Sequence, residues 1–226
     1  MTKTISAGLL PALFLTLSAI LCPVIVPLLF LPSVGQAGIF SKEKKHEEIA
    51  KRYGGAVVLI TPSDKDGKAL GAGNGFIVDP SGIVVTNYHC IKGATTAWVR
   101  LTNEAHYQVE GVLGVDKGRD IVVLKVKAKN LPSAPIGDSD KLSWGERIIV
   151  IDENTVSEGI VSAIKGAGGA IQFTSQIPLG NGGGPAFNMK GQVVGVITHL
   201  DKEGQNLNLA VPINLVKPLL KGRLIT

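Results

Sequence analysis

Apolar and polar positions alternate in short runs over most of the chain after residue 55, and glycine, proline, asparagine or aspartate separates one run from the next. Short alternating or β-branched runs at this spacing are typical of an antiparallel barrel or sandwich, and not of alternating strands and helices. The pattern predicts strands at Ala56–Ile60, Gly75–Val78, Ile83–Thr86, Ala97–Leu101, Val109–Val115, Ile121–Val126, Arg147–Ile151, Val156–Ala163, Ala170–Thr174, Gln192–Thr198 and Leu207–Val211.

Helical patterns flank this strand region. Ser41–Tyr53 has helical spacing and a charged face, with Ser41 placed to cap its start. Pro212–Leu220 begins with a proline and is basic near its end, which is typical of a closing helix. The polar stretch Lys127–Leu142 separates the strands into two halves. We therefore expect a helical segment at 38–54 and a single domain at 55–226, with a first barrel at about 55–130, a second at about 140–212 and a C-terminal helix at 212–221.

The beginning of the chain has a different pattern. Lys3 precedes an apolar run from Ala7 to Leu31, and the small-residue sequence Gly35-Gln36-Ala37 follows. This order is typical of a secretory signal peptide. We therefore expect a signal peptide at 1–37 and a secreted, periplasmic or cell-envelope location. Because the run also approaches the length that spans a bilayer, an uncleaved membrane anchor through residues 7–32 is the alternative.

Composition narrows the range of partners. The 226 residues carry a formal net charge of +5, but aromatic residues make up only 5% and the basic residues are scattered. Proteins that bind single-stranded nucleic acid stack bases on aromatic side chains beside a basic groove. The composition therefore predicts no nucleic-acid partner.

Three motifs follow one another in an informative order. Thr86-Asn87-Tyr88-His89-Cys90 follows an apolar strand, Asp120 precedes another, and Gly180-Asn181-Gly182-Gly183-Gly184-Pro185 comes last. Histidine, aspartate and nucleophile in this order match the chymotrypsin-type triad. Together with Gly73–Val78, Gly137–Asp140, Gly159–Ser162 and Gly191–Thr198, these motifs make the stretch from Gly73 to Val211 resemble the trypsin-like protease domain of the HtrA (DegP-like) family.

The resemblance implies an all-β fold of two six-stranded antiparallel barrels. It also implies that His89 is the general base of acyl transfer and that Asp120 orients it. The backbone N–H groups of Gly180 and Gly182 would form the oxyanion hole. The walls of the substrate pocket would include Gln176, Ile177, Val196, Ile197 and Thr198.

The nucleophile itself is missing. The resemblance places the reactive serine at position 182, where this chain has glycine, and glycine has no side-chain oxygen. Asn181 carries an amide, and Ser175 would need an unlikely fold-back to reach His89. The sequence therefore predicts that His89, Asp120 and Gly182 occupy the three catalytic positions. Gly182, at the position of the nucleophile, cannot attack a peptide bond.

Two further departures accompany this glycine. Ile151-Asp152-Glu153-Asn154 leads almost directly into Thr155, where the family has a Gly-Asn-Pro turn and several more residues. The chain also ends too soon for the peptide-binding PDZ domain that usually follows the protease in this family. The shortened loop beside the substrate cleft indicates a relaxed constraint on catalysis.

The cysteines and the remaining histidines carry less information. Cys22 lies in the expected signal peptide, so Cys90 has no partner for an internal disulfide in the mature chain. Cys90 is interpreted as a small buried residue or, alternatively, as a reactive thiol. His46, His106 and His199 show no metal-ligand spacing, so we expect neither a metal nor another cofactor.

Three functions remain open. The favoured one is a pseudoprotease that binds extended or unfolded polypeptide by strand addition without cleaving it. The second is an active serine endopeptidase for protein quality control whose recorded sequence carries a serine-to-glycine change. The third is a structural envelope protein with a vestigial cleft. By family resemblance, the region around Ile39 to Tyr53 would form trimer contacts.

Overall fold

The fold is described by a computed structural model that covers residues 36–153, 155–165, 169–175, 177, 182–202 and 205–226. The expected signal peptide, apart from its last two residues, and the alternative anchor through residues 7–32 lie outside the described residues. Among the helices of the described part, none combines the length and apolar character needed to cross a membrane.

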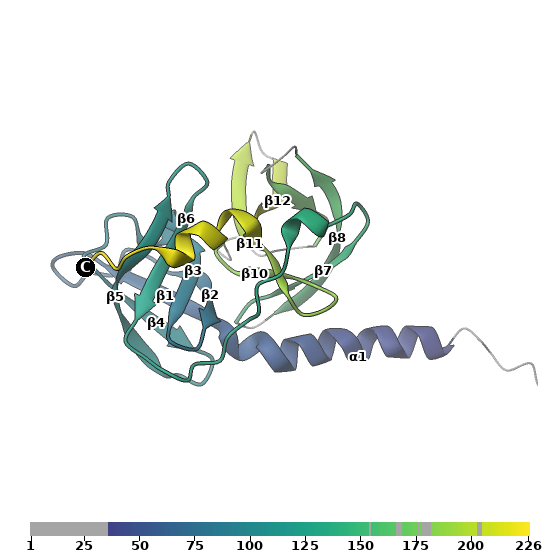
Figure 1. Ribbon diagram of the computed structural model, residues 1–226, viewed down its shortest axis with the longest axis horizontal. Coiled ribbons are helices and arrows are strands. Elements are labelled where there is room, and N and C mark those ends of the chain that lie inside the picture. The colour runs from purple at the N-terminus through teal and green to yellow at the C-terminus, as the bar shows by residue number, and fades with distance from the viewer. Residues whose placement is uncertain (1–35, 154, 166–168, 176, 178–181, 203–204) are drawn as a thin grey trace, which may run out of the picture. The chain divides into compact units, whose positions relative to one another are not determined.

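Within the described residues, the strands close into two antiparallel barrels of six strands each (Figure 1). The first barrel has the circular order β1-β2-β3-β6-β5-β4, and the second repeats it as β7-β8-β9-β12-β11-β10. The predicted all-β fold is therefore confirmed. The first barrel consists of β1 (Val57–Ser63), β2 (Gly73–Asp79), β3 (Ile83–Asn87), β4 (Thr96–Leu101), β5 (His106–Asp116) and β6 (Ile121–Val126). The second consists of β7 (Arg147–Ile151), β8 (Val156–Ile164), β9 (Ile171–Phe173), β10 (Pro185–Asn188), β11 (Val193–Lys202) and β12 (Gln205–Pro212).

The apolar positions of these strands build three buried clusters. One fills the first barrel around Ile60, Val99 and Leu124, and another fills the second barrel around Ile148 and Ile197. The third cluster lies between the barrels and combines Phe76 and Val123 with Ile149 and Phe187. Each barrel thus has its own core, and a shared apolar interface holds the two together.

The segment between the barrels is bonded to both of them. Ala134 donates its N–H to the carbonyl of Ile77 in β2, and Gly137 donates to Val193 in β11, each over 2.8 Å. A short 3₁₀ turn, η3 (Ser139–Lys141), then leads toward β7. This connection is an ordered part of the inter-barrel contact, because its backbone groups are satisfied on both sides.

Helix α1 (Gln36–Tyr53) leads into the first barrel and packs through its last turns. Ile49 is buried, and the ring of Tyr53 stacks on Phe187 of β10 with centroids 5.7 Å apart. Gly191 accommodates this ring, because a Cβ there would come within 2.6 Å of Tyr53 Cε2. The prediction that Ser41 caps the helix is wrong, since α1 begins at Gln36 and Ser41 lies inside it.

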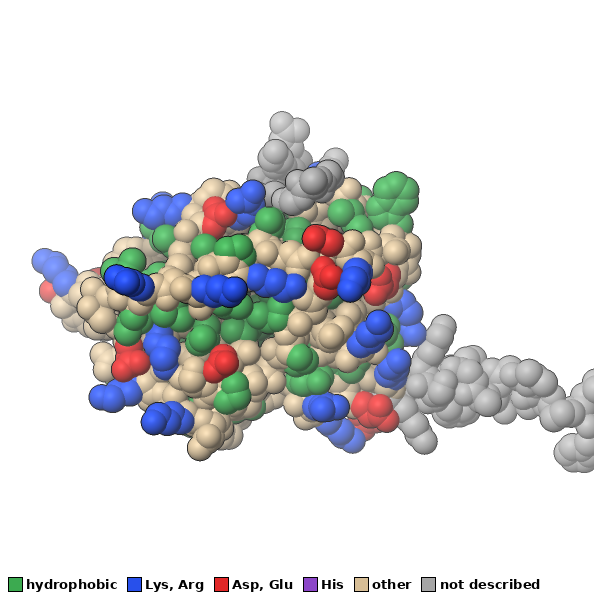
Figure 2. All heavy atoms as spheres, viewed as in Figure 1, with side chains coloured by type: hydrophobic (Ala, Val, Ile, Leu, Met, Phe, Trp, Pro, Cys, Tyr) green, Lys and Arg blue, Asp and Glu red, His purple; other side chains and the backbone are tan. Residues whose placement is uncertain are grey.

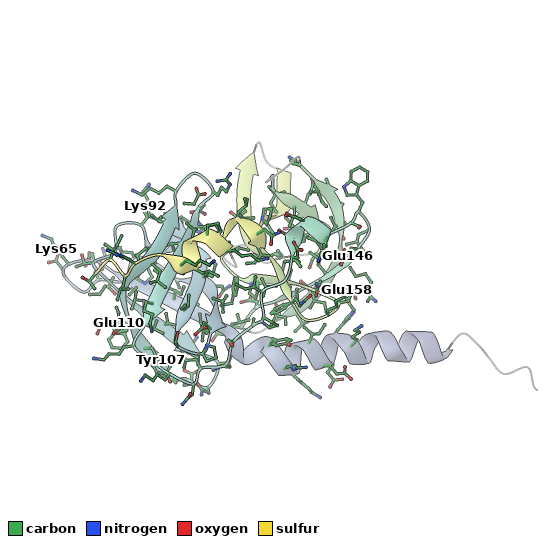
Figure 3. All side chains as sticks on the ribbon, viewed as in Figure 1. Lys65, Lys92, Tyr107, Glu110, Glu146 and Glu158 are labelled. Atoms are coloured by element: carbon green, nitrogen blue, oxygen red, sulfur yellow. The ribbon has the colours of Figure 1, made fainter. Side chains whose placement is uncertain are left out.

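Polar contacts add to this docking. His46 Nε2 lies 3.1 Å from Glu158 Oε2, and Glu158 Oε1 pairs with Arg147 Nε. Glu158 belongs to β8 and Arg147 to β7, and Figure 3 shows Glu158 on the side of the second barrel that faces α1. The last turns of α1 are therefore fixed to the second barrel by one aromatic contact and one charged cluster.

The chain closes with two 3₁₀ turns, η4 (Ile213–Leu215) and η5 (Lys217–Lys221), where the sequence pattern predicts a helix. Beyond them the backbones of Val112 and Ile225 exchange hydrogen bonds of 2.8 Å in each direction. The C-terminal residues thus return to β5 of the first barrel (Figure 1).

Candidate active site

The register between β3 and β6 brings the candidate histidine and aspartate together. Asn87, the last residue of β3, lies opposite Ile121, the first residue of β6. The chain then enters the 3₁₀ turn η2 (Tyr88–Ile91), which carries His89, while Asp120 directly precedes β6. Both residues consequently leave the sheet at the same edge.

Asp120 is held by hydrogen bonds from three consecutive residues. Its carbonyl accepts from Tyr88 N and from Asn87 Nδ2, each over 3.0 Å. Its carboxylate oxygen Oδ1 accepts from His89 N over 2.8 Å, and Oδ2 lies 2.5 Å from His89 Nδ1. Asp120 adopts a left-handed backbone conformation with φ of 57°. Such a conformation is uncommon for a residue other than glycine, and this set of bonds stabilises it.

The charge state of His89 follows from these contacts. The hydrogen bond to Asp120 and, next, the contact with Cys90 raise the pKa of His89 to about 10. The imidazole is therefore a cation at neutral pH, with a proton on each ring nitrogen. A general base must be neutral before it can accept a proton. In the structure as it stands, His89 acts as a charged partner of Asp120.

The glycine-rich loop is fixed by its backbone where it is described. Asn74 N in β2 donates to the carbonyl of Gly182 over 3.1 Å. Gly183 N donates to Ile197 O over 2.8 Å, and Ile197 N donates to Gly184 O over 2.9 Å. These bonds attach the loop to one strand of each barrel.

Gly183 can be nothing but glycine in this turn. It has a φ of 90°, and a Cβ built on it would lie 2.1 Å from Asn74 O and 2.6 Å from Thr86 Oγ1. Thr86 Oγ1 itself donates to Asn74 O over 2.6 Å. The loop thus approaches β2 so closely that no side chain fits between them.

The start of β2 connects this loop with His89. Gly73 packs against Cys90, because a Cβ at residue 73 would come within 2.3 Å of Cys90 Sγ. The following residue, Asn74, is the one bonded to Gly182. Cys90 Sγ in turn lies 3.6 Å from His89 Nε2. His89, Cys90 and the described part of the glycine loop therefore surround the same end of β2.

The remaining candidate residues have varied positions. Gly180 and Gln176 lie outside the described residues. The side chains of Val196 and Ile197 are fully buried, and Ile177 is partly buried against the core of the second barrel. Thr198 is buried and lines a cavity of about 170 Å³ that Asp120 also lines. The other residues around this cavity are Gly118, Arg119, Ala170, Val211, Pro212 and Leu215.

Ser175 is engaged elsewhere. Its Oγ lies 2.6 Å from Ser157 Oγ of β8, and its carbonyl accepts from Asn208 Nδ2. Only 1% of the residue is exposed. A hydroxyl committed in this way is not available as a replacement nucleophile.

Two further aspects of the site concern charge. Over the described part of the chain, no three histidine, cysteine, aspartate or glutamate side chains gather where they could hold a metal ion. Basic side chains on the face seen in Figure 2 are spread over both barrels and interleaved with acidic ones.

The sequence did not indicate how two residues of the histidine motif, Asn87 and Cys90, contribute to this site. Asn87 bonds to the carbonyl of Asp120, while its own Oδ1 is buried without a partner among the described residues. The sulfur of Cys90 points toward the imidazole of His89. The fact that the two residues are neighbours in the sequence does not predict this direction. The one signal in the sequence that could have identified Asn87 is its position at the end of an apolar strand, beside His89.

The fold and this site define a class of protein. The family described as "Trypsin-like peptidase domain" matches residues 73–196, which is more than half of the chain. The chain belongs to this family of trypsin-like peptidases. Among the curated proteins that it resembles, serine proteases of the HtrA and DegP-like type predominate in name.

Three relatives illustrate the range. "Putative serine protease HhoB" of Synechocystis sp. is 39% identical over 168 residues, which cover 67% of this chain and 40% of that protein. "Probable periplasmic serine endoprotease DegP-like" of Pseudomonas putida is 36% identical over 169 residues, which cover 67% and 35%. "Anti-sigma-I factor RsgI9" of Acetivibrio thermocellus is 33% identical over 176 residues, which cover 74% and 25%. The chain thus spans at most two fifths of the length of these three relatives.

Proposed function

We propose that this protein is a catalytically inactive member of the trypsin-like peptidases that binds extended polypeptide in the cell envelope. The observation that carries the proposal is glycine at position 182, in a loop that is otherwise fixed beside the pair formed by His89 and Asp120. The contact of this position with β2 runs through the carbonyl of Gly182 and so does not depend on a side chain there.

The size of the expected loss supports this proposal. In a subtilisin-type enzyme, removal of the serine alone costs roughly a million-fold in turnover. The donors of the oxyanion hole belong to the backbone and are not lost with the serine. A site that keeps these donors without the nucleophile can still hold a peptide, but it cannot form an acyl-enzyme.

The edge of β11 supports binding by strand addition. Within the described residues, the ladder between β10 and β11 ends at Val196, whereas the ladder between β11 and β12 continues to Lys202. The loop occupies both backbone groups of Ile197, so the next stretch, residues 198–202, has a partner strand on one side only among the described residues. An extended peptide would add to that edge through main-chain hydrogen bonds.

A comparison of two variants tests the lost activity. The full chain and its Gly182→Ser and Gly182→Ala variants are incubated with unfolded casein, and cleavage is followed over time. We expect no cleavage by the unmodified chain or by the alanine variant, and measurable cleavage by the serine variant as the pH is raised toward 10 and His89 loses a proton. Cleavage by the unmodified chain would overturn the proposal.

A second experiment tests the binding. A fluorescent peptide of extended conformation is titrated with the full chain, in parallel with the same peptide methylated on alternate backbone nitrogens. Methylation removes the donors that strand addition needs, so we expect binding to be lost with the methylated peptide only. Equal affinity for the two peptides would contradict binding by strand addition, and so would a lack of affinity for either of them.

The intact contact between His89 and Asp120 favours one alternative, an endopeptidase in which glycine at position 182 is a recent or introduced change. The casein experiment alone does not separate this alternative from the proposed function. The natural gene and its sibling sequences are also needed, because serine at position 182 in them would support the alternative. A purely structural role with a vestigial cleft predicts no affinity for either peptide. The envelope location rests on the predicted signal peptide and on relatives that are named periplasmic.

A further inference from the structure

The sulfur of Cys90 occupies an unusual place in this site. Cys90 is the free cysteine of the described residues, and it follows His89 directly in the turn η2. Its Sγ lies 3.6 Å from Nε2 of His89, while Nδ1 of the same ring faces Asp120. Cysteine, histidine and aspartate therefore form a chain of contacts in which the imidazole stands between a thiol and a carboxylate.

This geometry is the one that activates a thiol. His89 is already an imidazolium at neutral pH, so its Nε2–H faces the sulfur with a positive charge that the carboxylate of Asp120 holds in place. This neighbouring positive charge stabilises the thiolate, which is the reactive form of cysteine. The contact pattern thus provides a hydrogen-bond donor and a counter-charge for the thiolate sulfur.

The sulfur also remains chemically free. The residue that packs against it is Gly73, and a Cβ there would lie 2.3 Å from Sγ and 3.0 Å from Cβ of Cys90. A side chain at position 73 would therefore clash with the sulfur, and glycine leaves room for it. Only 9% of Cys90 is exposed, so access is restricted to small reagents.

We propose that Cys90 is a peroxide-reactive thiol, activated by His89 and Asp120, that forms a sulfenic acid. In the reactive ion pair, the imidazolium of His89 keeps its proton on Nε2, and the sulfur is a thiolate whose own proton has passed to solvent. The thiolate sulfur attacks one oxygen of a hydroperoxide, the O–O bond breaks, and the leaving alkoxide or hydroxide takes the proton from Nε2. The sulfur is oxidised and the peroxide is reduced to an alcohol or water, so that thiol and hydroperoxide yield sulfenic acid and alcohol or water.

This reaction is independent of peptide binding and of the residue at position 182. It uses the nitrogen Nε2, for which the structure provides sulfur as a partner. The described residues hold no second cysteine to form a disulfide, so the sulfenic acid is expected to persist until an external thiol reduces it.

The test uses hydrogen peroxide and the full chain at neutral pH. Sulfenic acid is trapped with dimedone, and the peptides that contain Cys90 and Cys22 are quantified separately by mass spectrometry. Cys90→Ser removes the site, His89→Gln removes the activating group, and His106→Gln is the matched control, since His106 is the exposed first residue of β5.

We expect labelling of Cys90 to be at least about tenfold slower in His89→Gln than in the unmodified chain, because the rate follows the thiolate fraction. His106→Gln should leave the rate unchanged. Equal rates in the unmodified chain and in His89→Gln would overturn the proposal. So would a Cys90 that is labelled in urea but not in the folded chain, since folding would then shield the sulfur and not activate it.

Discussion

Asn74 donates its backbone N–H to the carbonyl of Gly182 over 3.1 Å, and this bond joins the first barrel to the glycine loop of the second. The neighbouring residue Gly183 has a φ of 90°, and a Cβ on it would lie 2.1 Å from the carbonyl oxygen of Asn74. The position of the loop therefore depends on the backbone of residues 182 and 183 and on the absence of a side chain at the second of them.

Substitution of Gly183 by alanine should be strongly destabilising. The left-handed backbone costs a residue with a side chain about 1–3 kcal/mol, and the clash of Cβ with the Asn74 carbonyl adds to this cost. Gly93→Ala is the matched control, because Gly93 has a φ of 81° but nothing lies within 4 Å of the place that its Cβ would take. Urea unfolding should show a clearly larger loss for Gly183→Ala, and equal losses would mean that the close approach to β2 is unimportant.

The free energy of unfolding should depend on pH through His89. Its pKa is about 10 in the folded chain, against 6.5 for the free side chain. Below about pH 6.5 both states hold the proton and the stabilisation is complete, whereas between about pH 6.5 and pH 10 only the folded state retains it, so stability falls as pH rises.

Urea unfolding at several pH values in this window measures the effect. The His89→Gln variant should show a flatter dependence than the unmodified chain, and His106→Gln should keep the original slope. If all three slopes coincide, the ion pair between His89 and Asp120 does not contribute to stability.

We expect the ring of Tyr53 to keep the end of α1 packed against Phe187 of β10. Tyr53→Ala removes the ring that stacks on Phe187, and loss of a partly buried aromatic side chain should cost about 2–4 kcal/mol. The segment near Lys51 and Arg52 should then be cleaved faster by trypsin. Tyr107→Ala serves as the control, because Tyr107 packs against the core of the first barrel, whereas Tyr53 packs against the cluster between the barrels. Similar cleavage of α1 in both variants would contradict a specific role for the stack.

The charged cluster beneath α1 should contribute a smaller amount. Glu158→Gln removes the negative charge that His46 and Arg147 share. Partly exposed ion pairs stabilise proteins by about 1 kcal/mol or less, and salt screens them. Thermal unfolding at low salt should therefore show a small decrease that disappears at high salt. An effect that persists at high salt would indicate a packing role instead.

Much of the fold could be predicted because the strands alternate regularly. β6 and β7 have the predicted bounds, and β8 differs by a single residue. β10 was missed, since Pro185-Ala186-Phe187-Asn188 is short, begins with proline and is buried throughout, so that it has no alternation to detect. The predicted start of α1 at Ser41 is too late. Serine inside a helix lowers the stability of the helix by only about 0.5 kcal/mol, and one additional turn can contribute more than this.

The site could be predicted only in part. The order of the motifs pointed to His89 and Asp120, and the register of β3 against β6 explains why these residues meet. The left-handed conformation of Asp120 and the direction of the Cys90 sulfur depend on contacts between distant segments. A pattern along the chain carries no information about such contacts until the strands are paired.

The bonds around Asp120 have a consequence for how ancestry is inferred from sequence. Asn87, Tyr88 and His89 all bond to this one residue, and three of those bonds involve the backbone of one partner or of both. Selection for a folded protein can therefore preserve Asp120 whether or not the site cleaves peptides. Its presence in a sequence consequently records the needs of the scaffold as well as those of catalysis, and it does not certify an enzyme.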